Sequence, residues 1–215
     1  MRRLPHRTNS ESEQFVCQHL IHFYDDAYPA DAAGDFIAAG LLAGDTCIVM
    51  LRQPSRAAVE QRLQALGIAT GAGGPYAAVY TAMDTHAALS ELVVDGRLDL
   101  GRATAAVGQL LGQARGGGRV RLVGDPGPEL FAAGHEADAL ALESLVDKLA
   151  SVHGASVFCA YPIDGFYRER STSALLAMSA RHSAVTFPKR LWVDGYLAAG
   201  TRGDSRQHEP LADPG

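Results

Sequence analysis

The sequence is poor in cysteine. Only three cysteines, Cys17, Cys47 and Cys159, occur among 215 residues, and no two of them form a CxxC pair. An odd number of cysteines in apolar surroundings is typical of buried free thiols in a reducing compartment, whereas many structural zinc sites carry CxxC pairs. The sequence therefore predicts neither a disulfide framework nor a structural zinc site.

Long apolar runs and basic clusters are also missing. No apolar run approaches the ~20 residues that span a membrane, and Met1–Gln14 lacks the apolar region of a signal peptide. The chain carries 19 Lys and Arg residues against 24 Asp and Glu residues, a net charge of −5, so general binding of nucleic acid through its phosphates is not expected. We predict a cytoplasmic protein that contacts neither a membrane nor nucleic acid directly.

A phosphate-binding loop is absent from the place where we looked for one. Within Phe36–Gln53 the pattern predicts the end of a helix, a turn at Gly44-Asp45 and a buried strand, Thr46–Met50. Ligands of open α/β sheets bind beyond the carboxyl end of such a strand. A P-loop, G-x-x-x-x-G-K-[ST], would follow there, but Leu51–Glu60 contains neither glycine nor lysine. We expect a degenerate P-loop, and ATP hydrolysis by that route is not expected.

The rest of the chain alternates strands with helices. The predicted strands are Phe15–Tyr24, Thr46–Met50, Ala77–Tyr80, Arg119–Val123, Ser156–Ala160 and Ala184–Pro188. The predicted helices are Ala30–Leu42, Ser55–Leu66, Thr85–Val93, Asp99–Arg115, Glu129–Val152 in two pieces around Gly134, and Phe166–Ala180. This order predicts an α/β fold with a doubly wound, mainly parallel sheet in three αβα layers. We expect one domain over residues 15–195, a flexible lead at 1–14 and a disordered tail at 196–215.

Several polar side chains follow the ends of predicted strands, and each has two interpretations. Asp25 and Asp26 could hold a metal or transfer protons, or they could cap the next helix. Arg52 could meet an anion or a carboxylate, or it could be a solvated loop residue. Asp125, which directly follows an inner strand, could contact a ligand or act as an N-cap.

Other candidates have a structural reading beside the functional one. His19 and His22 lie three apart in a predicted strand, which puts them on opposite faces, so we expect no metal site there. Glu143 lies near an apolar helical stripe and is either a buried acid paired with Arg or His, or the edge of that stripe. Cys159 has no adjacent His or Lys to stabilise a thiolate, and no G-x-S-x-G motif is present. We expect no catalytic residue, no metal ligand and no cofactor.

A set of short stretches, in order along the chain, carries a family resemblance. The stretches are His19–Asp26, Phe36–Asp45, Val94–Asp99, Arg119–Asp125, Leu142-Glu143 with Leu145 and Leu149, Cys159-Ala160-Tyr161, Phe166, and His182–Val185. Together they resemble the MEDS domain (methanogen/methylotroph, DcmR sensory), the sensory domain of the dichloromethane dehalogenase regulator and a relative of the RecA/KaiC-like fold. The Pro-Gly-Pro that follows Asp125 departs from the more apolar run of that family.

The resemblance implies a non-catalytic ligand-sensing module for signal transduction on a degenerate nucleotide-binding fold. Because no helix-turn-helix or kinase region is evident, we expect it to regulate a partner protein in a transcription or kinase pathway, and the sequence leaves homo-oligomerisation open. The expected contacts of an unidentified small molecule are His19, Tyr24, Asp25, Arg52, Asp84, Asp125, Glu143 and Tyr161. The alternatives are a nucleotide-binding, ATPase-like module and a protein-interaction module with a vestigial pocket.

Overall fold

A six-stranded parallel sheet forms the centre of the protein. The computed structural model describes residues 18–115, 117–166 and 172–188. The strands are β1 (His19–Tyr24), β2 (Thr46–Met50), β3 (Tyr80–Met83), β6 (Val120–Gly124), β7 (Ser156–Pro162) and β8 (Ala184–Thr186). They pair in the order β3-β2-β6-β7-β1-β8, and every neighbouring pair is parallel. A separate antiparallel hairpin contains β4 (Val93–Val94) and β5 (Arg97–Leu98).

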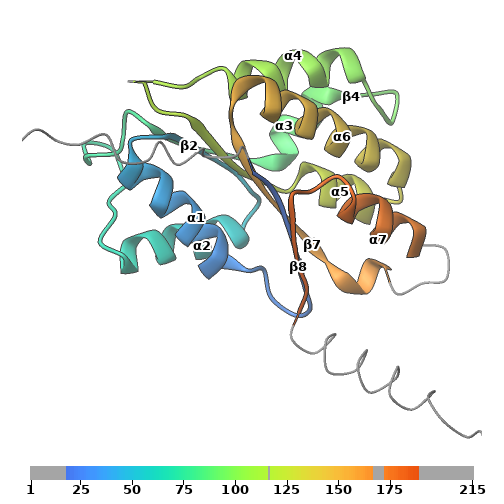
Figure 1. Cartoon of the computed structure of the whole chain (residues 1–215), viewed down its shortest axis with the longest axis horizontal. Helices are drawn as coiled ribbons and strands as arrows, with labels where there is room; N and C mark the ends of the chain where they lie inside the picture. The colour runs from blue at the N-terminus through green and yellow to red at the C-terminus, as the bar shows by residue number, and fades with distance from the viewer. Residues whose placement is uncertain (1–17, 116, 167–171, 189–215) are drawn as a thin grey trace, which may run out of the picture.

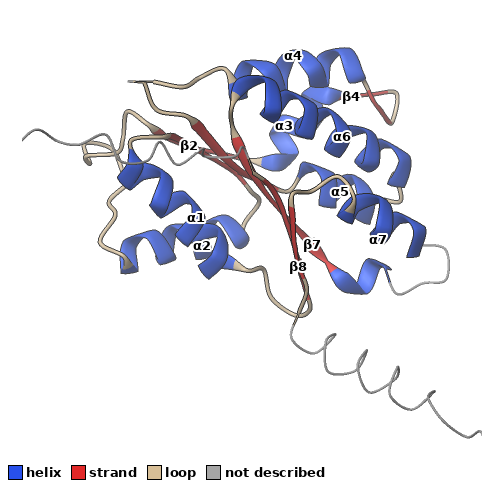
Figure 2. Cartoon of the chain, viewed as in Figure 1, coloured by secondary structure: helices blue, strands red, loops and turns tan. Residues whose placement is uncertain are grey.

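Helices cover both faces of this sheet, which confirms the predicted α/β fold with three layers (Figures 1 and 2). One face carries α1 (Ala30–Ala43) and α2 (Ser55–Ala65). The other face carries α3 (Thr85–Leu92), α4 (Leu100–Leu111), α5 (Pro126–Ala132), α6 (Glu136–His153) and α7 (Thr172–Ser179). Each face packs around its own apolar core. None of the helices in the described ranges is long and apolar enough to cross a membrane.

The strand patterns follow from their positions in the sheet. All residues of β2 are buried, because β2 lies between two strands and under helices on both faces, so its continuous apolar run is the pattern expected there. In β1 the burial alternates, and His19, Ile21 and Phe23 face the core beneath α6 and α7. Gly44 ends α1 with a φ of 84°, a left-handed conformation that glycine adopts without a steric penalty.

The strand order creates one place where neighbouring strands lead away from each other in opposite directions. From β1 the chain proceeds through β2 to β3 with α1 and α2 on one face, whereas from β6 it proceeds through β7 to β8 with helices on the other face. Adjacent strands therefore diverge at β2/β6, where β2 leads to β3 on one side and β6 leads to β7 on the other. Ligands of open α/β sheets bind at such switch points. The loops that follow β1 and β2, residues 25–29 and 51–54, contain neither glycine nor lysine.

Several predicted boundaries and caps were wrong. The third strand is Tyr80–Met83, because Ala77 and Val79 make turn hydrogen bonds to the residues before them. Tyr161 and Pro162 lie beyond the end of the predicted strand Ser156–Ala160, but they extend β7 because they pair with Phe23 and Tyr24.

The N-cap positions of the first two helices are occupied by proline. Ser55 is the first residue of α2, and Pro54 occupies the cap position. Asp25 and Asp26 lie in a bend after β1, and Pro29 occupies the cap position of α1. The predicted lead at 1–14 and tail at 196–215 lie outside the described residues.

Candidate functional site

An apolar pocket with a volume of about 370 Å³ lies between the sheet and helices α3, α4 and α6. Its size is within the range of pockets that hold small ligands. The apolar lining comes from Met50, Met83, Ala87, Ala88, Leu92, Ala106, Val107, Leu110, Leu122, Leu142, Val146 and Val157. Glu91 and Gln109 line it from exposed positions, whereas Glu143 and Cys159 line it from buried positions. The pocket thus has a polar rim, apolar walls and a polar inner end.

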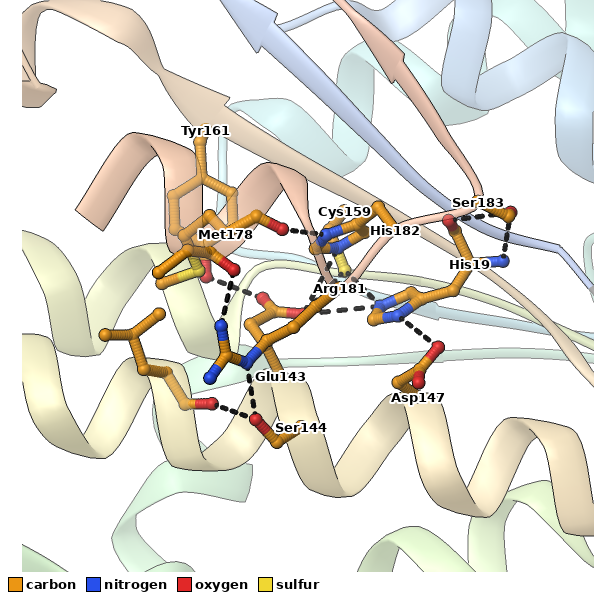
Figure 3. Close-up of polar contacts among 12 residues, drawn as sticks. His19, Glu143, Ser144, Asp147, Cys159, Tyr161, Met178, Arg181, His182 and Ser183 are labelled. Atoms are coloured by element: carbon orange, nitrogen blue, oxygen red, sulfur yellow. Dashed lines mark hydrogen bonds and ion pairs between the residues drawn. The ribbon is translucent and has the colours of Figure 1, made fainter. Parts of the chain in front are cut away.

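The inner end belongs to a cluster of four side chains, which we call the buried tetrad: His19, Glu143, Cys159 and His182 (Figure 3). The Oε2 atom of Glu143 lies 3.3 Å from Nε2 of His19 and 3.5 Å from Nε2 of His182. The sulfur of Cys159 lies 3.5 Å from the same Oε2 atom and 3.5 Å from Nε2 of His19. Four polar groups therefore converge on one point in the core.

The fold positions the tetrad through ordinary periodicity. On α6 the buried stripe includes Ala139, Leu142, Glu143, Val146 and Ala150, so Glu143 faces the sheet as an apolar residue at that position would. His19 lies at the start of β1, and its Cα pairs with that of Val157 on β7. His182 lies in the short connection between α7 and β8. The tetrad thus connects β1, α6, β7 and the approach to β8.

Further contacts orient the members of the tetrad. Nδ1 of His182 lies 2.7 Å from the carbonyl oxygen of Met178. Because a carbonyl only accepts, Nδ1 carries the proton, and Nε2 faces the tetrad with its lone pair if the ring is neutral. Nδ1 of His19 lies 3.4 Å from Oδ1 of Asp147, and the hydroxyl of Tyr161 donates to Oε1 of Glu143 at 2.6 Å.

The electrostatics of the tetrad favour a charged Glu143. Burial by itself raises the pKa of Glu143, but its close contacts with the imidazoles of His182 and His19 bring that pKa well below its usual value. Burial lowers the pKa of His19, but Glu143 and Asp147 outweigh it, so the net shift is upward. Burial and the charge of Glu143 raise the pKa of the Cys159 thiol well above normal. In the absence of another cation, the tetrad holds a carboxylate beside a protonated thiol.

A second polar group lies at the β2/β6 switch point. The hydroxyl of Thr85 is within hydrogen-bonding distance of Oδ1 of Asp125 and lies 3.0 Å from the carbonyl oxygen of Met50. Arg52 binds Glu129 at 2.7 Å and lies 3.1 Å from Nε2 of His86. Burial raises the pKa of Asp125 to about 6, Glu129 adds to this shift, and Thr85 and Arg52 oppose it. A carboxyl group with a raised pKa at a strand end is a feature of many functional sites.

The expected ligand contacts fall into two groups. His19, Glu143 and Tyr161 lie in or against the buried tetrad. Arg52 and Asp125 lie at the β2/β6 switch point, and the charge of Asp125 also acts on nearby Tyr24.

Two expected contacts have other surroundings. Asp84 accepts a hydrogen bond from the backbone N–H of Ala87, so it caps α3, and it also lines the pocket. Asp25 is half-buried in the bend after β1. Of the eight expected residues, only Asp84 and Glu143 line the pocket.

The structure decides between the interpretations that the sequence left open for Glu143, Arg52 and Asp125. Glu143 is a buried acid paired with histidine. Arg52 meets a carboxylate, that of Glu129. Asp125 occupies the N-cap position of α5, but its side chain makes no capping hydrogen bond. His19 and His22 lie on opposite faces of β1, as expected.

The sequence analysis missed that Cys159 and His182 belong to the candidate site. One feature of the sequence could have indicated Cys159. It lies two residues before Tyr161, an expected contact, and residues two apart in a strand share the same face.

Comparison with known families decides the family. Residues 18–178 match the sequence model of MEDS, described as the MEthanogen/methylotroph, DcmR Sensory domain. The chain belongs to the MEDS family. The match extends from β1 into α7 and includes the tetrad residues His19, Glu143 and Cys159. A search of curated proteins finds no match to the chain. The family is one of sensory domains, so this MEDS domain has a role in sensing or signalling.

Proposed function

We propose that this MEDS domain senses a small, mainly apolar molecule, which binds in the pocket beneath α3, α4 and α6. In response, the domain regulates a partner protein in a transcription or kinase pathway. The observation that carries this proposal is the apolar pocket with Glu143 and Cys159 at its inner end. Binding pockets of this kind combine apolar walls with a few polar groups that orient the ligand. The domain acts by binding, without catalysis.

The chemistry of the pocket limits the ligand. Its apolar walls favour a hydrocarbon part, since burial of apolar surface drives binding. A polar group that enters the buried end must find a hydrogen-bond partner there, and Glu143 and Cys159 offer an acceptor and a thiol. A volume of about 370 Å³ suits a small molecule. The loops after β1 and β2 lack the glycines and lysine that would hold a nucleotide phosphate.

The packing of α6 offers a route for the signal. Glu143, Leu142 and Val146 of α6 line the pocket, and α6 also contacts α4, α5 and α7. A ligand with higher affinity for one arrangement of these helices shifts the population toward that arrangement. Leu100 on α4 and Leu176 on α7 are 51% and 66% exposed, so apolar side chains on these helices are accessible to a partner.

A ligand panel with a blocked pocket tests the proposal. n-Butanol, n-butyl chloride, n-butanethiol and butyrate hold the apolar part constant and vary the polar group. We expect at least one of them to raise the melting temperature of the wild type, because a ligand at about one hundred times its Kd stabilises the fold by about 2.7 kcal/mol. The variant Ala106→Phe should abolish this shift because its ring occupies the pocket.

The matched control is Ala105→Phe, which alters the neighbouring exposed residue of α4. It should keep the ligand response of the wild type. An equal response in Ala106→Phe and Ala105→Phe would contradict binding in this pocket. A shift that occurs only with ATP and magnesium would instead support the nucleotide-binding alternative, and no response to any compound would leave the protein-interaction alternative favoured.

A further inference from the structure

We propose that the buried tetrad, His19, Glu143, Cys159 and His182, is a binding site for one transition-metal ion of the zinc class. The four side chains offer two imidazole nitrogens, one carboxylate oxygen and one sulfur, and these atoms all lie within 4.8 Å of one another. This inference goes beyond the proposed sensing of a small molecule. It stands whether or not the pocket binds an organic ligand.

The donor set selects the class of ion. Imidazole and thiolate are the preferred ligands of Zn²⁺ and its neighbours in the first transition series, and a carboxylate completes many zinc sites. Magnesium and calcium prefer sites composed of oxygen ligands. Two nitrogens and a sulfur with one carboxylate oxygen therefore favour zinc, with cobalt as a spectroscopic substitute.

Four of the six distances between the ligand atoms fit the edges of a coordination tetrahedron. Bonds of about 2.0–2.3 Å to the metal separate tetrahedral ligand atoms by about 3.3–3.8 Å. The contacts of Oε2 of Glu143 with the two histidines are 3.3 and 3.5 Å, and both contacts of the Cys159 sulfur are 3.5 Å. A direct N–H···O hydrogen bond is usually 2.7–3.2 Å long. The two nitrogen–oxygen contacts are therefore long for hydrogen bonds but suit ligands that share one ion.

The surroundings of the tetrad hold its ligand atoms in place, as partners around metal sites do. The carbonyl of Met178 fixes the ring of His182, Asp147 faces the outer nitrogen of His19, and Tyr161 holds the other oxygen of Glu143. Nε2 of His182 is buried, and its 3.5 Å contact with Oε2 of Glu143 is longer than an ordinary hydrogen bond, so this nitrogen has no hydrogen-bond partner among the described residues. A buried nitrogen without a hydrogen-bond partner is costly, and a metal ion at the centre of the tetrad would satisfy it.

The competing explanation is an ion-pair network without metal. Such a network keeps the Cys159 thiol protonated, whereas a bound ion replaces the thiol proton and bonds to the sulfur. Only the metal site therefore contains a sulfur–metal bond. When the metal is cobalt, this bond produces a measurable absorption band. The inner end of the pocket would also differ, because the ion would lie beside two of its lining residues.

The test uses the full untagged chain, stripped with a chelator and titrated with Co²⁺ and then Zn²⁺. We expect one ion per chain, a thiolate-to-cobalt absorption band with the visible bands of tetrahedral cobalt, and loss of these bands when Zn²⁺ displaces cobalt. Cys47→Ser is the matched control, since Cys47 is a buried thiol on β2 that lies outside the tetrad. It should keep the full spectrum, as should Cys17→Ser.

Two variants of the tetrad complete the test. Cys159→Ser should lose the thiolate band, and His182→Gln should weaken cobalt binding at least ten-fold, with circular dichroism to show that each remains folded. If Cys159→Ser does not fold, His182→Gln and the cysteine variants outside the tetrad still decide the question. Absence of a stoichiometric cobalt spectrum in the wild type, or a spectrum that survives Cys159→Ser unchanged, would overturn the proposal.

Discussion

Replacement of Asp125 by asparagine should stabilise this domain at neutral pH. Asp125 is 8% exposed, and its pKa is raised from about 3.8 in the unfolded chain to about 6. Burial of the carboxylate is the largest cause, and the charge of Glu129 adds to it. Asparagine has the same shape, carries no charge and keeps an oxygen that can accept the hydrogen bond from Thr85.

The sign of the pH dependence follows from proton binding. Below about pH 4 the carboxyl group is protonated in both states, and the raised pKa has no effect on stability. Between about pH 4 and 6 the unfolded chain loses its proton first, so the free energy of unfolding falls as the pH rises. Above about pH 6 the deficit is complete, and a difference of about two pKa units corresponds to about 3 kcal/mol. Asp125→Asn removes this loss of stability, because asparagine does not ionise.

Urea unfolding of the wild type and Asp125→Asn between pH 4.5 and 8 measures the effect. We expect the variant to be more stable by up to about 3 kcal/mol at pH 7.5, with an advantage that shrinks as the pH falls toward 4.5. Asp26→Asn, an exposed residue in the bend after β1, removes the same charge and should show little of this effect. An advantage of Asp125→Asn that does not change with pH, or a loss of stability at pH 7.5, would refute the reasoning.

Two further substitutions test the packing around Glu143. Tyr161→Phe should lower the free energy of unfolding by about 1–3 kcal/mol, because it leaves a buried oxygen of Glu143 without its donor. Its control, Tyr80→Phe, removes a buried hydroxyl that has no hydrogen-bond partner in the described chain, so it should be neutral or stabilising. Equal effects of the two substitutions in urea unfolding would argue against this account. Gly127→Ala should destabilise the fold by about 1–3 kcal/mol, since its new methyl group would collide with Glu143 and the hydroxyl of Tyr161. Its control, Gly108→Ala, places a methyl group in open space on α4 and should stabilise the fold by about 0.4–1 kcal/mol. A melting temperature for Gly127→Ala equal to that of the wild type would contradict the close packing.

The sequence by itself determined the local structure and the fold class. The apolar run Thr46–Met50 matches β2 to the residue, because a strand buried on both faces needs no polar positions. Helix α1 begins at the predicted Ala30 and ends beside Gly44, the residue that the turn signal indicated. The alternation of such elements predicts a parallel sheet with helices on both faces. Together with the order of short motifs, it also indicated the MEDS family, which the match over residues 18–178 confirms.

Only the tertiary structure decided which buried faces meet. His19 and Cys159 are 140 positions apart, yet the pairing of β1 with β7 brings the imidazole to the thiol. Periodicity places Glu143 near a buried helical stripe and Cys159 in an apolar strand. It does not show that α6 crosses the sheet above them, or that β8 joins the edge of β1 and brings His182 into the tetrad. The site is composed of contacts distant in sequence, and local patterns do not specify those contacts.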